Sequence, residues 1–241
     1  MDWNAFFEVH KDLPREGPGS TEDVVWATAL AGVPEGAAIC DAAAGPGADV
    51  EALAQTVPGA QVLAFDKHDG FVAQMQTRFS GARNVTVQKA DLAEIANLPK
   101  APFDMIWCAG ALYFLGLKNG LEVMRGALKP GGVLAFSEPC FFTDTPSPKA
   151  RAFWEGYPTR DRAGIAAAVS AVGFDILGTR DVSDAGWEAY YHPMEARIAM
   201  LRAEGDPRMT DMLDLCAKEA EDWRAVRSET GYLLTVARRL S

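Results

Sequence analysis

Residues 38–49 constrain the fold of this chain more than any other stretch. A short apolar run ends at Asp41, and a loop of small residues containing Gly45 and Gly47 follows it. From Val50 onward, apolar residues recur on one helical face. Small residues let a backbone pass close to a ligand, and the free N–H groups at a helix start point toward it. This strand, loop and helix predict a cofactor site at the carboxyl end of the first strand of an open α/β sheet.

The length of the chain bounds its organisation. Its 241 residues suffice for one large domain with a substantial core. We expect a single domain over 1–241 that comprises an N-terminal lid segment over 1–30, a cofactor-binding core over 31–182 and a helical insertion over 183–230 before the last strand. A run of breakers at 13–20 fits either a plain linker or this lid.

The charge balance limits the partners. The formal net charge is -10, and Lys and Arg form no basic stripe, which argues against a nucleic-acid partner. Residues 1–4 show no basic region followed by an apolar run, and no apolar stretch reaches the roughly 18 residues that span a membrane. We therefore expect a cytoplasmic protein with no membrane partner.

The four cysteines, Cys40, Cys108, Cys140 and Cys216, show neither C-x-x-C spacing nor a histidine at zinc-site spacing. We expect no metal site, and we interpret the cysteines as small buried hydrophobic residues in a reducing compartment. The first three fall near the carboxyl ends of predicted strands, where ligands bind, so a thiol role stays open.

Two further acids follow the next strands. Asp66 ends an apolar strand over 61–66 and comes 25 residues after Asp41, at the place where an acid accepts hydrogen bonds from ribose hydroxyls. Asp91 follows a third short strand over 84–88. It could bind a ligand or cap a helix.

The glycine spacing argues against a dinucleotide site. A G-x-G-x-x-G fingerprint that begins at Gly45 requires a third glycine where Val50 stands, and it has no acid at the position of Asp41. A P-loop requires a lysine that this loop lacks. A dehydrogenase remains a weaker alternative, which predicts NAD binding.

The segment from Asp41 to Gly47 resembles the D-x-G-x-G-x-G motif of class I S-adenosylmethionine-dependent methyltransferases. Four further signals over 37–137 follow that family's order: Asp66, Asp91-Leu92, Phe103-Asp104 and Leu128-Lys129-Pro130-Gly131-Gly132. A narrower likeness, to bacterial methyltransferases of unassigned substrate, covers most of the chain. The resemblance implies a Rossmann-like sheet of seven mostly parallel strands, with helices on both faces and a small helical and loop cap.

The resemblance also implies the roles of the loop residues. Asp41 would orient the amino group of the methionine moiety, while Ala43, Gly45 and Gly47 would let the backbone approach it. Ala43 departs from the glycine of the motif. If that position needs a positive φ, alanine costs about 1 kcal/mol there. An alternative is therefore a non-catalytic protein that binds S-adenosylmethionine or S-adenosylhomocysteine in a degenerate site.

The same resemblance extends to the adenosine part of the cofactor. Asp66 would accept from the ribose hydroxyls, and Lys67 would flank the adenine. Asp91 would accept from the adenine amino group, and Leu92 would pack near its ring. The backbone of Cys108-Ala109 would lie beneath the sulfonium.

Methyl transfer from a sulfonium is an in-line displacement, so we expect catalysis mainly by proximity and desolvation. A base is needed only for an acceptor that arrives protonated. The candidates are Glu138, Tyr113 and His192. Glu138 has a structural alternative, and His192 has another as a surface histidine before a helix that starts at Pro193.

Aromatic residues and one arginine are candidates for contacts with the acceptor or the lid: Arg15, Trp154, Tyr157, Tyr190 and Tyr191. Arg15 would face a carboxylate as the N-terminal segment closes. The acidic charge and the aromatic segments favour a small acceptor, neutral or cationic. We expect a monomer or a homodimer.

Overall fold

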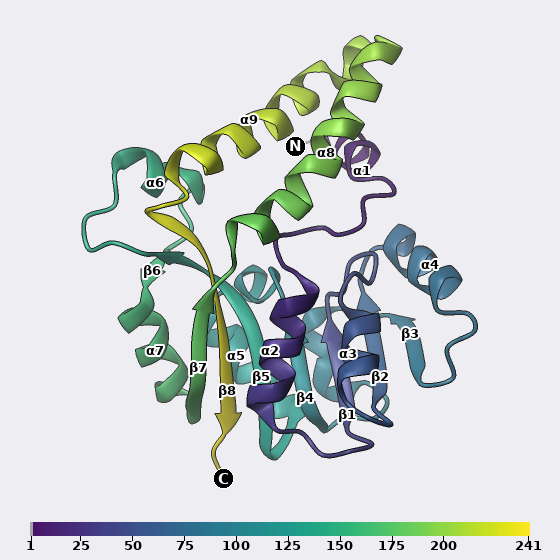
Figure 1. The fold of residues 1–241 in the computed structure, drawn as a ribbon, viewed down its shortest axis with the longest axis vertical. Helices are drawn as coiled ribbons and strands as arrows, with labels where there is room; N and C mark the ends of the chain where they lie inside the picture. Colours follow the sequence, from purple (N-terminus) through teal and green to yellow (C-terminus); the bar gives the residue numbers. More distant parts are fainter. Residues whose placement is uncertain (1) are drawn as a thin grey trace.

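The computed structural model describes residues 2–241 as an open twisted sheet with helices on both faces and a helical cap at one end (Figure 1). The strand order is β3-β2-β1-β4-β5-β8-β7, and the short β6 pairs with β5. Strands β1 to β5 are parallel to one another, whereas β8 is antiparallel to both β5 and β7. This is the mostly parallel Rossmann-like sheet that the sequence predicts, with β6 as an eighth strand.

The strands are β1 (Ala38–Ala42), β2 (Gln61–Asp66), β3 (Val85–Lys89), β4 (Phe103–Cys108), β5 (Leu128–Phe141), β6 (Arg160–Asp161), β7 (Phe174–Asp181) and β8 (Thr230–Arg239). The α-helices are α1 (Trp3–Val9), α2 (Thr21–Ala31), α3 (Val50–Thr56), α4 (Asp69–Arg78), α5 (Leu117–Ala127), α6 (Pro148–Phe153), α7 (Arg162–Ala171), α8 (Asp184–Glu204) and α9 (Thr210–Val226). Three 3₁₀ helices are η1 (Leu92–Asn97), η2 (Leu112–Leu115) and η3 (Pro207–Met209).

Local sequence sets the element ends. Ser20 caps α2 as its position predicts, since its hydroxyl accepts from the Asp23 N–H at 3.2 Å. The Lys-Pro-Gly-Gly run over 129–132 predicts a break between a helix and a strand over 133–137. Instead β5 begins at Leu128, directly after α5, and the pairing with β4 shifts between Phe103 and Met105. The strand absorbs the run as an irregularity.

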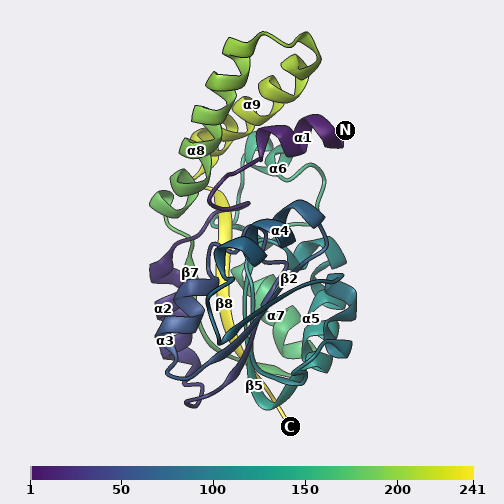
Figure 2. The same ribbon diagram turned by 90° about the vertical axis from the view of Figure 1, so that its right-hand side faces the viewer.

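The two faces of the sheet bury separate cores. Alternate residues of the central strands point to opposite sides: Ile39 and Met105 join one core, while Cys40 and Ile106 join the other. The first core is closed by α2, α3 and the cap helices, and the second by η1, α5 and α7 (Figure 2). Both faces are therefore covered, which suits a sheet of near-continuous apolar strands.

The cap consists of α8 and α9, which lie between β7 and β8 in the chain and project beyond the sheet, with α1 beside them (Figure 2). Arg197 of α8 holds α1 through Glu8, with Nη2 2.5 Å from Oε1. The prediction that a helix begins at Pro193 is wrong, because α8 starts at Asp184 with Ser183 as its cap and Pro193 lies inside it. None of the helices in the described part of the chain is long and apolar enough to cross a membrane.

Candidate active site

The loop after β1 turns sharply where the parallel strands end. Ala43, Gly45 and Gly47 all have positive φ, at 56°, 55° and 81°. A Cβ on Gly47 would lie 2.9 Å from atoms of Met75 and Phe79, so glycine is required there by space as well as by φ. At Ala43 the chain carries a left-handed alanine, which costs about 1 kcal/mol relative to glycine. The departure from the glycine motif thus places a strained residue in the loop.

Asp41, the penultimate residue of β1, is a buried acid that lacks a full set of hydrogen-bond partners. Its residue exposure is 3 %, and Oδ2 has no hydrogen-bond partner among residues 2–241. Burial raises the pKa of Asp41 well above its usual value, and the charges of Asp49 and Asp66 add to the shift while Arg15 opposes it. An unsatisfied buried carboxylate is costly unless a cation or donor reaches it. This oxygen therefore suits a ligand's ammonium group.

Asp66 ends β2 and holds the same loop. Its Oδ2 accepts from the Gly45 N–H at 3.0 Å, and its Oδ1 accepts from the His68 N–H at 2.9 Å. The His68 ring also lies against Oδ1, with Nδ1 at 3.0 Å. Asp66 thus stands at the edge of the glycine loop, where the sequence places an acid.

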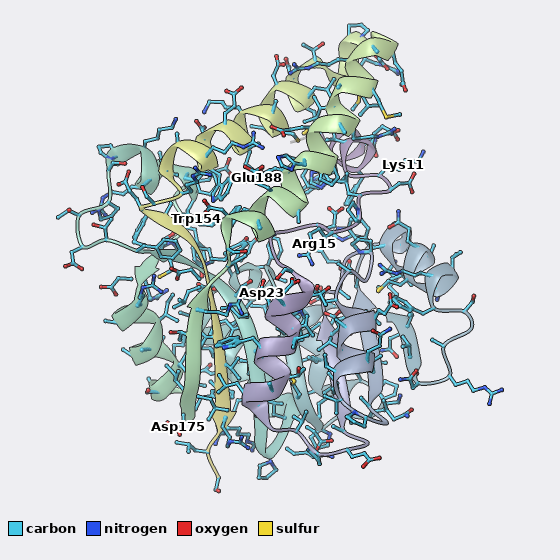
Figure 3. All side chains as sticks on the ribbon, in the orientation of Figure 1. Lys11, Arg15, Asp23, Trp154, Asp175 and Glu188 are labelled. Carbon is cyan, nitrogen blue, oxygen red and sulfur yellow. The ribbon has the colours of Figure 1, made fainter. Side chains whose placement is uncertain are left out.

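The N-terminal segment crosses this site. Arg15 donates from Nη2 to Asp49 Oδ1 at 2.8 Å, and its label in Figure 3 lies between the cap and the sheet edge. The other carboxylate oxygen of Asp49 accepts from the Trp107 indole N–H at 3.0 Å. A carboxylate of the chain itself therefore holds Arg15, and Asp49 ties the N-terminal segment to β4.

A second pair fastens the same segment. His10 Nδ1 lies 2.7 Å from Glu16 Oε2, and the His10 ring stacks on Phe6 at a centroid distance of 3.9 Å. Glu16 packs over the glycine loop, since its Cγ would lie 3.2 Å from a Cβ on Gly45. Glu16 thus lies against the glycine loop, and its pairing with His10 fixes it there.

The remaining cofactor candidates lie along the neighbouring strand ends. Asp91 caps η1, because its Oδ1 accepts from the Ala93 N–H at 2.9 Å, and Leu92 beside it is buried. Lys67 is exposed, with Nζ 5.9 Å from the centroid of Phe114. Cys108 is buried at the end of β4, and burial raises its thiol pKa, which disfavours the reactive thiolate. Ala109, the next residue, is partly buried.

Glu138 lies on β5 at the same edge of the sheet, beyond the register partner of Cys108. It is 1 % exposed, and its Oε1 accepts from the Tyr157 hydroxyl at 2.5 Å. Its Oε2 has no partner within the described residues. Burial raises the pKa of Glu138 to about 7, although the Tyr157 hydrogen bond and the charge of Arg160 oppose the shift. A carboxyl group with this pKa can accept a proton near neutral pH.

Five aromatic residues continue from Tyr157 toward the cap, and we name them the aromatic wall: Tyr157, Tyr113, Tyr232, Trp187 and Tyr191. Successive ring centroids along this order are 5.9, 6.4, 5.1 and 5.9 Å apart. The wall joins η2, α8, β8 and the loop after α6. Two of its residues, Tyr157 and Tyr191, are among those that the sequence analysis names as candidates for contacts with the acceptor or the lid.

Trp154 and Tyr190, the other two aromatic residues predicted to contact the acceptor or the lid, lie next to the wall. Trp154 lies below α9 (Figure 3), its centroid 5.4 Å from that of Tyr232, and its indole N–H donates to Thr230 Oγ1 at 2.7 Å. Tyr190 is buried, with its ring centroid 6.2 Å from that of His10.

His192 does not join this group. Its side chain is 69 % exposed, and Nε2 lies 3.1 Å from Glu188 Oε2 on the same helix. The expectation that His192 serves as a base is therefore not supported by its position, because α8 begins before Trp187 and turns His192 outward.

Sequence reasoning missed four residues that contact this site: Glu16, Asp49, Glu219 and Tyr232. The position of Glu219 could have been predicted from the sequence, because it lies at helical spacing from Met212, Cys216 and Trp223, which are buried on the inner face of α9. No local pattern predicts the role of Asp49, because its hydrogen-bond partners Arg15 and Trp107 are distant in sequence.

The fold and the site together define a class. A mostly parallel sheet in which β8 is antiparallel, a glycine loop after β1 and buried acids around that loop are the features of a nucleotide-type cofactor site at the carboxyl ends of the parallel strands. Among these acids, Asp41 has a buried oxygen without a hydrogen-bond partner in the described residues, which a donor or cation of a ligand would satisfy.

Comparison with known proteins agrees with this class. A family described as "Methyltransferase domain" matches residues 39–132. Trans-aconitate 2-methyltransferase of Paracidovorax citrulli is 32% identical over 182 residues, which cover 71% of this chain and 69% of that protein. A relative with the same name from Variovorax paradoxus is 31% identical over 58% of this chain and 51% of that protein.

Solved structures agree on the fold. The crystal structure of a SAM-dependent methyltransferase from Geobacter sulfurreducens in complex with S-adenosylhomocysteine superposes with a TM-score of 0.83 at 18% identity, over 97% of each chain. A second, from Thiobacillus denitrificans, gives 0.82 at 16% identity over 96% of each chain. The chain belongs to the class I S-adenosylmethionine-dependent methyltransferases. It is an enzyme that uses S-adenosylmethionine to methylate a small-molecule acceptor.

Proposed function

We propose that the methyl donor binds across the carboxyl ends of β1, β2 and β4, with Asp41 holding its ammonium group. The observation that carries this assignment is the unpartnered, buried Oδ2 of Asp41 beside the positive-φ loop. Asp66, with Lys67 nearby, would bind the ribose side, Asp91 and Leu92 the adenine, and the Cys108–Ala109 backbone would lie beneath the sulfonium. When bound, S-adenosylmethionine supplies a methyl group on a positively charged sulfur leaving group.

The acceptor, in this proposal, lies between the donor site and the aromatic wall. The chain would align the nucleophile and exclude water, with Trp154, Tyr190 and the N-terminal segment at Arg15 covering the site. For an acceptor that arrives protonated, Oε2 of Glu138 would receive the proton, and the Tyr157 hydroxyl would keep Oε1 oriented. Tyr113 lies beside Tyr157 and would line the same space.

The named relatives act on trans-aconitate, a tricarboxylate. In this chain two acids, Glu138 and Glu219, lie at the ends of the aromatic wall, while Arg15 is already paired with Asp49 and His10 with Glu16. A neutral or cationic small acceptor is therefore favoured over a polyanion or a nucleic acid. A cytoplasmic location and a monomeric or homodimeric state are further parts of the proposal, and light scattering of the purified protein tests the oligomeric part.

Calorimetric titration tests the donor site. We expect S-adenosylmethionine and S-adenosylhomocysteine to bind and NAD not to bind. Asp41→Asn keeps the shape and removes the charge, so both affinities should fall about 10- to 100-fold, as expected for the loss of a hydrogen bond to a charged group.

The matched control is Asp69→Asn, which removes one exposed acid near the site and should change either affinity less than about twofold. Unchanged affinity in Asp41→Asn would remove Asp41 from the site. Binding of NAD in preference to both would overturn the donor assignment itself.

A further inference from the structure

Glu219 is an acid on the inner, apolar face of α9. It shares this face with Cys216 and Trp223, which are buried, yet its own side chain remains accessible to solvent. Its carboxyl is nonetheless surrounded closely enough for burial to raise its pKa. Both properties hold for a side chain in a concave part of the surface, where water reaches it although neighbouring atoms surround it.

The position of Glu219 is fixed from the aromatic wall. Its Oε1 accepts from the Tyr191 hydroxyl at 3.1 Å, the one hydrogen bond to this carboxylate within residues 2–241. The Tyr191 ring in turn packs against Trp187 and Trp223, at centroid distances of 5.9 and 5.5 Å. Oε2 therefore remains available to a ligand while Oε1 is held.

The aromatic wall thus has a carboxyl group at each end. Glu138 stands at the Tyr157 end, close to the donor site, and keeps an unpartnered oxygen although it is 1 % exposed. Glu219 stands at the Tyr191 end. The charges of both acids act on Tyr113, which lies between the two ends.

Aromatic faces and carboxylates share one preference in ligands: both attract cations. The positively charged side chains near the wall already have partners within the protein, so they do not cancel this attraction for a cationic ligand. His10, whose charge acts on Glu219, is paired with Glu16. Arg224, whose charge acts on Tyr191, is paired with Glu188 and Glu195. Arg160 acts on Glu138, and its guanidinium donates to the Pro158 carbonyl at 3.3 Å.

We propose that the acceptor is a small amine whose ammonium group is bound by Glu219 while its body packs against Tyr113 and Tyr157, the two residues of the wall that are partly exposed, and its nucleophile faces the donor. Glu219 is then a specificity-determining residue, and the proposal rests on the donor site proposed above. The length of the wall separates the two ends, so the ammonium bound at Glu219 is distinct from the atom that is methylated near Glu138.

The test uses the full chain saturated with S-adenosylhomocysteine and three probes of matched size: 2-phenylethylamine, 2-phenylethanol and phenylacetate. Trans-aconitate is the fourth. We expect the amine to bind at least about 10-fold more tightly than the alcohol, and the two anions to bind most weakly. Glu219→Gln should abolish the preference of the amine over the alcohol and leave the affinity for S-adenosylhomocysteine unchanged.

Glu221→Gln is the matched control, because it removes the same charge from the exposed face of the same helix. It should retain the preference. Tyr191→Phe keeps the carboxylate but frees it, and should reduce the preference only partly. Equal binding of the probes, no binding of the amine, preference for either anion, or an unchanged preference in Glu219→Gln would each overturn the proposal. Failure of the donor site would appear separately, as loss of S-adenosylhomocysteine binding in the unaltered protein.

Discussion

The donor side and the acceptor side of this site are built in different ways. On the donor side, each acid lies at or just beyond the carboxyl end of its own strand: Asp41 is the penultimate residue of β1, Asp66 the last of β2, and Asp91 comes two residues after β3. On the acceptor side, the contacts join distant segments, such as Tyr157 with Glu138 and Tyr191 with Glu219. Donor recognition is thus encoded locally by the parallel sheet, whereas acceptor recognition depends on how the cap packs.

The largest expected effect separates the two sides chemically. Glu138→Gln removes the proton acceptor near the donor but leaves the glycine loop untouched. With an amine acceptor found by screening, we expect kcat/KM to fall about 100-fold or more. The affinity for S-adenosylhomocysteine should stay within about twofold. Equal loss of both would show that the two sides are one functional unit.

The same residue predicts a pH dependence. Because the pKa of Glu138 is about 7, kcat/KM of the unaltered enzyme should rise with pH through about 7, and Glu138→Gln should lack this rise. The folded protein binds this proton more tightly than the unfolded chain. Ionisation therefore destabilises the fold as pH rises from about 4.5 to 7, by about 3 kcal/mol in total. Denaturant unfolding should find the variant more stable than the parent at pH 8, and the difference should disappear near pH 4.5.

A smaller effect is expected for the ion pair between Arg15 and Asp49, which ties the N-terminal segment to the sheet. Arg15→Ala leaves Asp49 with the Trp107 N–H alone, and the two side chains of the ion pair are only 12% and 11% exposed. We expect a loss of about 2 kcal/mol in the free energy of unfolding, since the pair is largely but not fully buried. Adding Asp49→Asn should restore part of it. An unchanged stability would mean that the N-terminal segment contributes little to closing the site.

The smallest effect concerns the loop alone. Ala43→Gly relieves a left-handed alanine at φ 56° and should raise the unfolding free energy, by less than about 1 kcal/mol because the unfolded chain also gains freedom. Donor affinity should remain unchanged or improve slightly. Ala44→Gly, one residue further along the loop, provides the control and should be destabilising or neutral. A destabilised Ala43→Gly would show that the methyl group packs against the loop usefully.

The sequence predicts the donor side more fully than the acceptor side for a physical reason. Strand ends, turn glycines and helix caps are set by neighbouring residues, so the β1 loop, the Ser20 cap and the order of the acids are visible in the sequence. The start of α8 is misplaced by sequence reasoning because Pro193 signals a helix start but lies inside a helix whose packing tolerates it. No local pattern pairs Arg15 with Asp49 or Tyr191 with Glu219, because tertiary packing brings those residues together.

The chain leaves the sheet before the cap and returns to it after the cap at adjacent points. The Val182 N–H, just before α8, donates to the Tyr232 carbonyl at 2.9 Å, just after α9. A continuous segment whose ends already touch can change length or sequence without disturbing the strand pairing on either side. Replacement of residues 183–229 would thus replace the cap, including Glu219, and leave the donor site unchanged. In this architecture, diversification of the acceptor requires no redesign of the methyl-donor chemistry.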